Sequence, residues 1–99
     1  MENFKTLGGI LVKKKQVTIT NGTGLHARPA SLLINNAVQF DAKMKMIYDG
    51  KEANLKSIIS LMSLAVGAGE DVIIQADGAD EEEALDTIVN VINKEFADQ

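Results

Sequence analysis

The C-terminal segment Asp80–Phe96 carries the clearest periodic pattern in the chain. Its large apolar residues recur every three or four positions, the spacing that aligns side chains along one face of an α-helix, and they are Leu85, Ile88, Ile92 and Phe96. Asp80 and Glu83 resemble a capping box, and the acidic run Glu81–Glu83 suits the positive end of a helix dipole. The segment is therefore predicted to form an amphipathic helix with one buried face.

Four shorter segments are predicted to form β-strands. Three of them alternate apolar and polar residues, as a strand with one buried face does, and they are Val17–Thr20, Lys43–Tyr48 and Asp71–Ala76. The dipeptide Asp49-Gly50 follows the second of these and is a strong signal for a two-residue hairpin. Lys51–Asn54 is accordingly predicted to be the return strand.

Two further helices are predicted. The first opens at Arg28-Pro29, because proline is tolerated in a first turn, and runs to about Val38 or Gln39. The second begins at Ser57 and ends at Gly67. Apolar residues at helical spacing define the buried faces, which are Ala30, Leu33, Ile34, Ala37 and Val38 in the first helix and Ile58, Leu61, Met62 and Ala65 in the second.

The resulting order of elements is β-α-β-β-α-β-α. This order predicts an α+β fold, an open-faced β-sandwich in which a four-stranded antiparallel sheet is covered on one face by three helices. A chain of 99 residues has room for one such domain, assigned to residues 13–99. Residues 1–12 lack a clear period and are assigned to an N-terminal extension that we expect to be loosely ordered.

Composition excludes several classes of function. The net charge of −4 weighs against direct binding to nucleic acid or to anionic lipid. The chain has no Cys and a single His, so thiolate and multi-His metal sites are excluded, and neither a metal nor another cofactor is expected. No apolar run approaches the roughly 20 residues of a membrane span. We therefore expect a cytoplasmic monomer without membrane insertion.

The only histidine and the only arginine, His26 and Arg28, stand two residues apart between a glycine-containing loop and a helix start. A helix N-terminus presents free backbone N–H groups and a partial positive charge, which together favour an anion. An imidazole near neutral pH is largely uncharged and nucleophilic, so it can carry a phosphoryl group that the arginine stabilises. On this fragment alone, a simple helix-capping role for His26 is equally well supported.

Two motifs resemble one known family. The run Thr23–Ala30, TGLHARPA, resembles the active-site signature of HPr, the histidine-containing phosphocarrier of the sugar phosphotransferase system. The run Asn54–Leu64, NLKSIISLMSL, resembles the regulatory serine region of the same family. The resemblance covers about Lys13 to Phe96, and the order of elements agrees with it.

The resemblance implies a phosphocarrier and not an enzyme with its own turnover. His26 would accept a phosphoryl group on Nδ1 from phosphorylated enzyme I and pass it to the IIA component of a sugar permease. Arg28 matches the arginine of the family's active site and would bind the phosphoryl oxygens. The P–N bond of phosphohistidine is labile, which suits a group that has to move on.

Ser57 matches the serine that some relatives phosphorylate through an HPr kinase/phosphorylase. From the residues alone Ser57 is a helix N-cap, and the two roles are compatible. Ile58 and Met62 are core residues by periodicity, whereas in the family part of this patch docks partners. The alternative function is that of a regulatory protein which, phosphorylated on Ser57, acts as a corepressor with a catabolite-control transcription factor.

Overall fold

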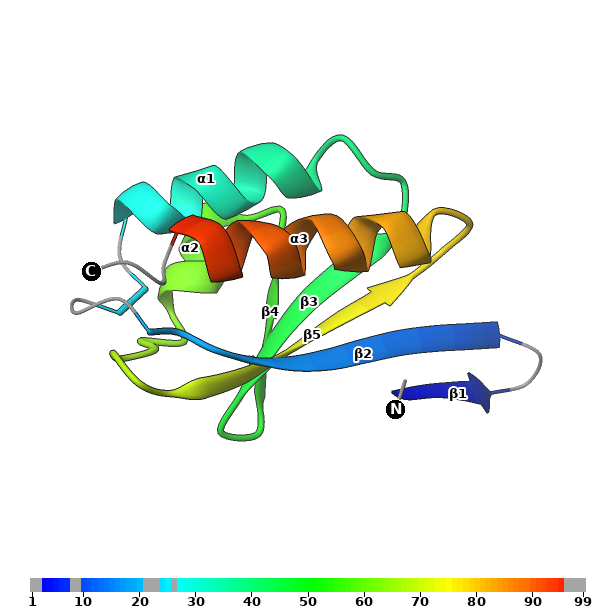
Figure 1. Cartoon of the computed structure of the whole chain (residues 1–99), viewed down its shortest axis with the longest axis horizontal. Helices are drawn as coiled ribbons and strands as arrows, with labels where there is room; N and C mark the ends of the chain where they lie inside the picture. Colours follow the sequence, from blue (N-terminus) through cyan, green and yellow to red (C-terminus); the bar gives the residue numbers. More distant parts are fainter. Residues whose placement is uncertain (1–2, 8–9, 21–23, 26, 96–99) are drawn as a thin grey trace.

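The computed structural model describes residues 3–7, 10–20, 24–25 and 27–95, with the backbone alone given for residues 3–7, residues 10–12 and Glu95. Its elements are β1 (Asn3–Leu7), β2 (Ile10–Thr18), α1 (Ala27–Ala37), β3 (Lys43–Tyr48), β4 (Lys51–Asn54), α2 (Ile58–Met62), β5 (Asp71–Asp77) and α3 (Glu81–Glu95). The strands form a single antiparallel sheet in the order β1-β2-β5-β3-β4. All three helices lie on one side of it (Figure 1), which confirms the α+β open-faced sandwich.

The β3–β4 hairpin has the bounds that the sequence predicts. Asp49 and Gly50 connect the strands with φ angles of 54° and 79°, as a type I′ turn requires at both central positions. Tyr48 then lies opposite Lys51, and the pairing continues to Lys45 opposite Asn54.

The sheet has one strand that the sequence pattern did not predict. β1 pairs with the first part of β2, from Leu7 opposite Ile10 to Asn3 opposite Lys14. The expected four-stranded sheet is therefore present as β2-β5-β3-β4, with β1 added at its edge as a fifth strand. The strand predicted over Val17–Thr20 has other bounds: β2 runs from Ile10 to Thr18, because its first half pairs with β1. Strand pairing uses backbone groups, so a segment without apolar alternation can still form a strand.

The β1–β2 hairpin overlaps little with the rest of the sheet. β2 pairs with β5 only through Lys13–Thr18, so just two positions of β2 have a partner on both sides. A variant that begins at Val12 is therefore expected to keep its free energy of unfolding within about 1 kcal/mol of that of the full chain. Urea denaturation of both proteins measures the difference. A loss of several kcal/mol would show that the hairpin is docked on the domain.

The second helix is shorter than predicted. α2 ends at Met62, and Ala65 adopts a φ of 55° before the chain turns towards β5. Of the four residues predicted on its buried face only Leu61 is buried. The loop residues Leu64 and Val66 are buried instead, so a single helical turn followed by a loop covers this part of the sheet. Val38, predicted on the buried face of the first helix, is 54% exposed.

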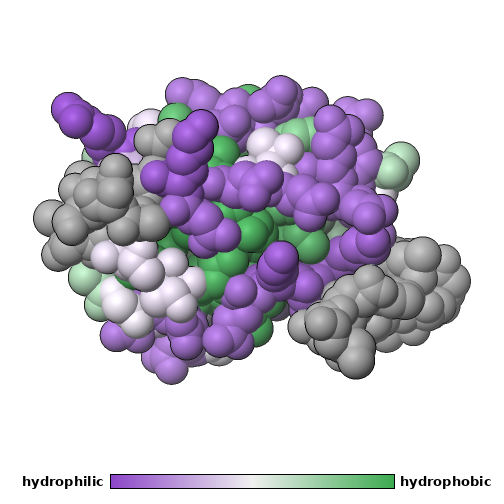
Figure 2. Space-filling model, viewed as in Figure 1, coloured by the Kyte–Doolittle hydropathy of each residue, from purple (hydrophilic) through white to green (hydrophobic). Residues whose placement is uncertain are grey.

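The core lies between the sheet and the helices. Its largest fully buried side chains come from every layer and are Ile19, Leu33, Met44, Met46, Leu55, Leu61, Val72, Ile74, Ile88 and Ile92. Leu85 is buried as predicted, while Phe96 is outside the part of the chain that the structure describes. Figure 2 shows the result from the viewpoint of Figure 1: hydrophilic residues cover most of this face, and hydrophobic ones are visible mainly in its middle.

Asp80 ties the start of α3 to the loop after α1. Its Oδ2 accepts the Asp41 amide at 2.9 Å and its Oδ1 the Ala42 amide at 2.8 Å. Both carboxylate oxygens are thus engaged outside the helix, in contacts that the predicted capping box did not include. The hydrogen bond from Asp41, assisted by that from Ala42 and by the charge of Lys56, holds the pKa of Asp80 below its ordinary value.

Asp80→Asn is expected to lower the melting temperature at neutral pH, because an amide NH₂ would face one of these backbone donors. The folded pKa is depressed, so the ionised carboxylate stabilises the fold above the unfolded pKa of about 3.9. This contribution is lost as pH falls through the folded pKa. Melting temperatures of both proteins across the acidic range should therefore converge at low pH. A difference independent of pH would contradict this assignment.

Candidate functional site

The chain enters α1 through two closely held residues, Gly24 and Leu25. Gly24 has a φ of 73°, and a Cβ there would lie 2.7 Å from the Val66 carbonyl oxygen and 2.9 Å from Gly67. Only glycine fits this close approach of two backbones. Leu25 is buried, and its amide donates to the Val66 carbonyl at 3.0 Å. The entry to α1 is thus fixed against the loop that follows α2.

His26, the predicted phosphoryl acceptor, lies outside the described residues, but both of its neighbours in the chain are described. Leu25 is the anchored residue before it, and Ala27 after it is the first residue of α1. The sequence prediction of a helix that opens at this point is confirmed to within one residue. The prediction that His26 and Arg28 act together on one group is not tested by the described geometry.

Arg28 is exposed in the first turn of α1. That turn contains no acidic residue, so no side chain of its own neutralises the positive end of the helix dipole. Pro29 occupies a position where a backbone donor would lack an intrahelical partner. An exposed guanidinium and the free amides of an eleven-residue helix together provide a setting for a phosphoryl group.

Ser57 is the N-cap of α2, as predicted. Its backbone is extended, with φ of −130° and ψ of 118°, and its Oγ accepts the Ser60 amide at 3.3 Å. Lys56 precedes it and donates from Nζ to the Phe40 carbonyl at 2.6 Å. Ser57 is half-buried, so the hydroxyl combines a capping role with partial access to solvent.

An apolar surface lies on α2. Ile58 is 39% exposed and Met62 37%, so the two residues that periodicity placed in the core reach solvent. Ile59 is 81% exposed, and it lies off the buried face that the apolar period predicts. Residues two positions apart lie on different sides of a helix, so the burial of Leu61 directs Ile59 outwards. α2 contacts α1 and lies beneath its N-terminal half (Figure 1), which places this surface beside the α1 site.

Two further observations concern metal ions and membranes in the described part of the chain. No group of three or more His, Cys, Asp or Glu residues is placed there to hold a metal ion. No helix among residues 27–95 is long and apolar enough to cross a membrane. The α1 N-terminus with its exposed Arg28 and the neighbouring apolar surface of α2 form the candidate site.

Comparison with known proteins points to one family. The family model PTS-HPr, described as PTS HPr component phosphorylation site, matches residues 13–94. HPr-C-His from Thermoanaerobacter tengcongensis is 41% identical, with a TM-score of 0.82 over 88% of this chain and 98% of that one. The phosphocarrier protein HPr from Bacillus anthracis str. Ames is 40% identical, with a TM-score of 0.77 over 81% and 95%. Crh, the Bacillus subtilis catabolite repression containing protein, is 41% identical, with a TM-score of 0.69 over 81% and 92%.

Proposed function

The chain belongs to the HPr family, the phosphocarriers of the phosphotransferase system, and from this premise we propose that it carries the phosphoryl group on His26. Phosphorylated enzyme I is the proposed donor. The imidazole Nδ1 attacks phosphorus, a P–N bond forms and the bond to the donor breaks. A nucleophile on the IIA component of a sugar permease then takes the group, and the P–N bond breaks in turn.

The observation that carries this proposal is the start of α1 immediately after His26. The helix offers unpaired amides and an exposed Arg28, without an acidic side chain in its first turn. Each of these favours an anion beside the histidine. Arg28 is proposed to bind the phosphoryl oxygens and to stabilise the charge that they carry during transfer.

Incubation with phosphoenolpyruvate and enzyme I tests the proposal. The expected product carries one additional phosphoryl group by intact mass and loses it in acid, as phosphohistidine does. A product that keeps its phosphate in acid would indicate a phosphoester and contradict the assignment to His26. Omitting enzyme I is the control for direct modification by phosphoenolpyruvate.

The exposed apolar surface of α2, made of Ile58, Ile59 and Met62, is proposed to dock enzyme I and IIA. Ile59 is the most exposed of the three, at 81%, so it contributes little to the core. A few residues near the centre of an interface carry most of its binding energy, and charged residues are depleted there. The three residues lie on α2, which contacts α1 and lies beneath its N-terminal half (Figure 1). This position suits partners that must approach His26.

Ile59→Glu is accordingly expected to raise the KM for phosphorylation by enzyme I by about tenfold, the effect of losing one moderate interface contact. Its melting temperature should stay near that of the parent. Val38→Glu is the matched control, because Val38 is also an exposed apolar residue, at 54%, and it follows the C-terminal end of α1, away from α2. An unchanged KM for Ile59→Glu would remove this residue from the docking surface.

A regulatory role of Ser57 is proposed in addition to the carrier role of His26. An HPr kinase/phosphorylase would phosphorylate the hydroxyl, and the phosphoserine form would act as a corepressor with a catabolite-control transcription factor. The chain is 41% identical to Crh over most of both chains, and this similarity supports a regulatory role in addition to the carrier role. The N-terminal position of Ser57 on α2 supports it, because added negative charge there meets the positive end of the helix.

A further inference from the structure

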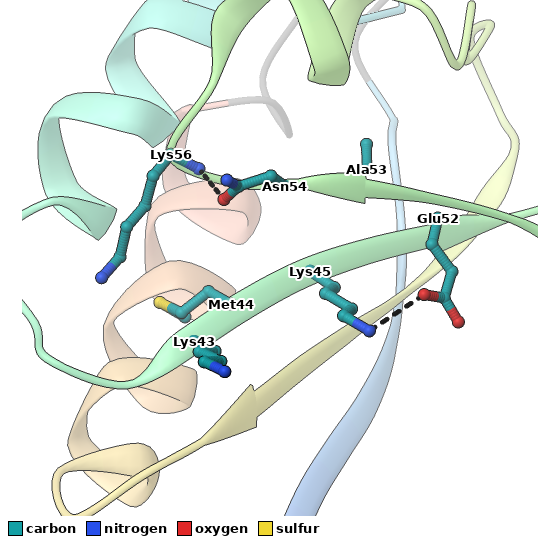
Figure 3. A pocket seen from close by; sticks show the side chains of 7 residues that line it. All are labelled: Lys43, Met44, Lys45, Glu52, Ala53, Asn54 and Lys56. Carbon is teal, nitrogen blue, oxygen red and sulfur yellow. Dashed lines mark hydrogen bonds and ion pairs between the residues drawn. The ribbon is translucent and has the colours of Figure 1, made fainter.

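A cavity of about 390 Å³ opens on the sheet where β3 and β4 cease to pair. Their register ends with Lys45 opposite Asn54, and the Leu55 amide then donates to the Met44 carbonyl at 3.0 Å. The polar residues that line the cavity are Lys43, Lys45, Glu52, Asn54 and Lys56 (Figure 3). Arg28 and the residues of α1 do not line it, so it is separate from the site proposed above.

The lining is positively charged although the whole chain is acidic. Three lysines face one glutamate, a local net charge of +2 in a protein of net charge −4. The Lys45 ammonium pairs with Glu52 at 3.0 Å (Figure 3). Two lysines are left without a carboxylate at ion-pair distance within the described chain. Asp77 lies opposite Lys43 in the β3–β5 register, and the charge of Lys56 acts on Asp80, but neither acidic residue lines the cavity. The lining itself therefore keeps an excess of positive charge, which attracts anions.

The two remaining lysines are held differently. Lys56 donates to the Phe40 carbonyl, an uncharged acceptor, at 2.6 Å, and its charge also acts on Asp80. Lys43 is exposed and forms no ion pair with any described residue. A lysine of this kind is a mobile point charge that can close on an anion once it arrives.

Asn54 adds a neutral polar side chain to the lining. Its Oδ1 accepts the Lys56 amide at 2.9 Å, which turns the carbonyl side of the side chain towards the backbone (Figure 3). The Nδ2 group takes no part in that contact and can donate to a ligand. Two ammonium groups and an amide donor match the several oxygens of one phosphoryl group better than they match a single carboxylate.

We propose that this cavity binds a phosphoryl dianion, either inorganic phosphate or the phosphate of a small metabolite. Cavities that hold small molecules range from about 300 to 1,000 Å³, and this one lies near the lower end. The ligand is therefore a compact one, of the size of a three-carbon phosphate ester. The inference does not depend on the phosphocarrier role, because no residue of the cavity takes part in the proposed transfer.

Amide NMR of the labelled full chain, titrated with inorganic phosphate and with glycerol 3-phosphate, tests the proposal. We expect saturable shifts at Lys43, Lys45, Asn54 and Lys56 with at least one of the two probes. The probe that binds more tightly indicates whether the ligand is free phosphate or a phosphate ester. Shifts that rise linearly without saturation would overturn the proposal, as would shifts confined to other residues.

Charge and location are tested with variants. Lys43→Gln should weaken binding about tenfold, the loss expected for one hydrogen bond between charged groups. Lys51→Gln is the matched control, because Lys51 is an exposed lysine of β4 outside the cavity, and its affinity should equal that of the parent. Equal affinities for Lys43→Gln and the parent would overturn the proposal.

Two further experiments test whether the phosphate binds at another site and whether other anions bind equally well. The cavity shifts should persist in Arg28→Ala, whose α1 N-terminus lacks the guanidinium, and their disappearance would assign the phosphate to α1 instead. Succinate, a dicarboxylate of similar charge, should bind at least about tenfold more weakly. Equal binding of succinate would contradict recognition of the phosphoryl group.

Discussion

Replacement of His26 with alanine is expected to abolish the labelling of this protein by phosphoenolpyruvate and enzyme I while leaving the fold intact. The acceptor nitrogen disappears, and the described residues of the domain contain no other imidazole. The entry to α1 is held by the neighbouring Leu25, whose amide bonds to the Val66 carbonyl at 3.0 Å, so the helix should still begin at Ala27. Labelling is followed with radioactive phosphoenolpyruvate, and the fold by circular dichroism. Acid-labile phosphate retained on the variant would contradict the assignment.

Arg28→Ala is the companion to this variant. It removes a stabilising charge but not the nucleophile, so the label should still form and still be acid-labile. The rate should fall by about 10²-fold, the usual loss when one donor to a charged transition state is removed. Because Arg28 is exposed, stability should change little. An unchanged rate would show that the helix N-terminus suffices without the guanidinium.

Phosphorylation of Ser57 is expected to slow the phosphorylation of His26 by enzyme I by about tenfold or more without destabilising the domain. Phosphate adds about two negative charges at the N-terminus of α2, where the helix dipole favours them. The melting temperature should therefore hold steady or rise slightly. The same charges lie beside Ile58, which is 39% exposed on the proposed docking surface, and a partner would have to desolvate them.

The measurement compares rates and melting temperatures of the unmodified and the Ser57-phosphorylated protein. Ser57→Ala is the control, because it removes the N-cap acceptor at a cost of about 1 kcal/mol yet adds no charge, so its transfer rate should stay normal. Equal rates for the unmodified and the Ser57-phosphorylated protein would leave Ser57 a helix cap only. A marked fall in melting temperature on phosphorylation would show that the inhibition works through the fold.

The sequence pattern predicted those parts of the fold that depend on residues close together in the chain. The β3–β4 hairpin follows from alternation and from Asp49-Gly50, which tolerate the two positive φ angles. The buried face of α3 follows from its period, since Ile88 and Ile92 are fully buried. Contacts between distant segments were not predictable in this way. Asp80 bonds to amides 38 and 39 residues away, and β1 pairs through its backbone without any apolar alternation.

In the candidate site too, features that depend on sequence neighbours were predicted and contacts between distant segments were not. The start of α1 beside Arg28 and the cap at Ser57 were predicted, because both depend on sequence neighbours. The exposure of Ile58 and Met62 was not predictable from the period, because α2 is shorter than predicted and the loop residues Leu64 and Val66 supply core positions after it. The close approach of Gly24 to Val66 likewise joins two loops that only the tertiary structure brings together.

Onward transfer to a IIA component tests the central claim most directly. Enzyme I, phosphoenolpyruvate and a IIA component are combined with and without this protein, and the phosphate on IIA is measured over time. A carrier predicts that IIA is phosphorylated only when this protein is present, and that the phosphohistidine on His26 forms before the label on IIA. If His26 is labelled but IIA gains no phosphate at a rate above the control, with any of the IIA components of the same cell, the carrier account is contradicted.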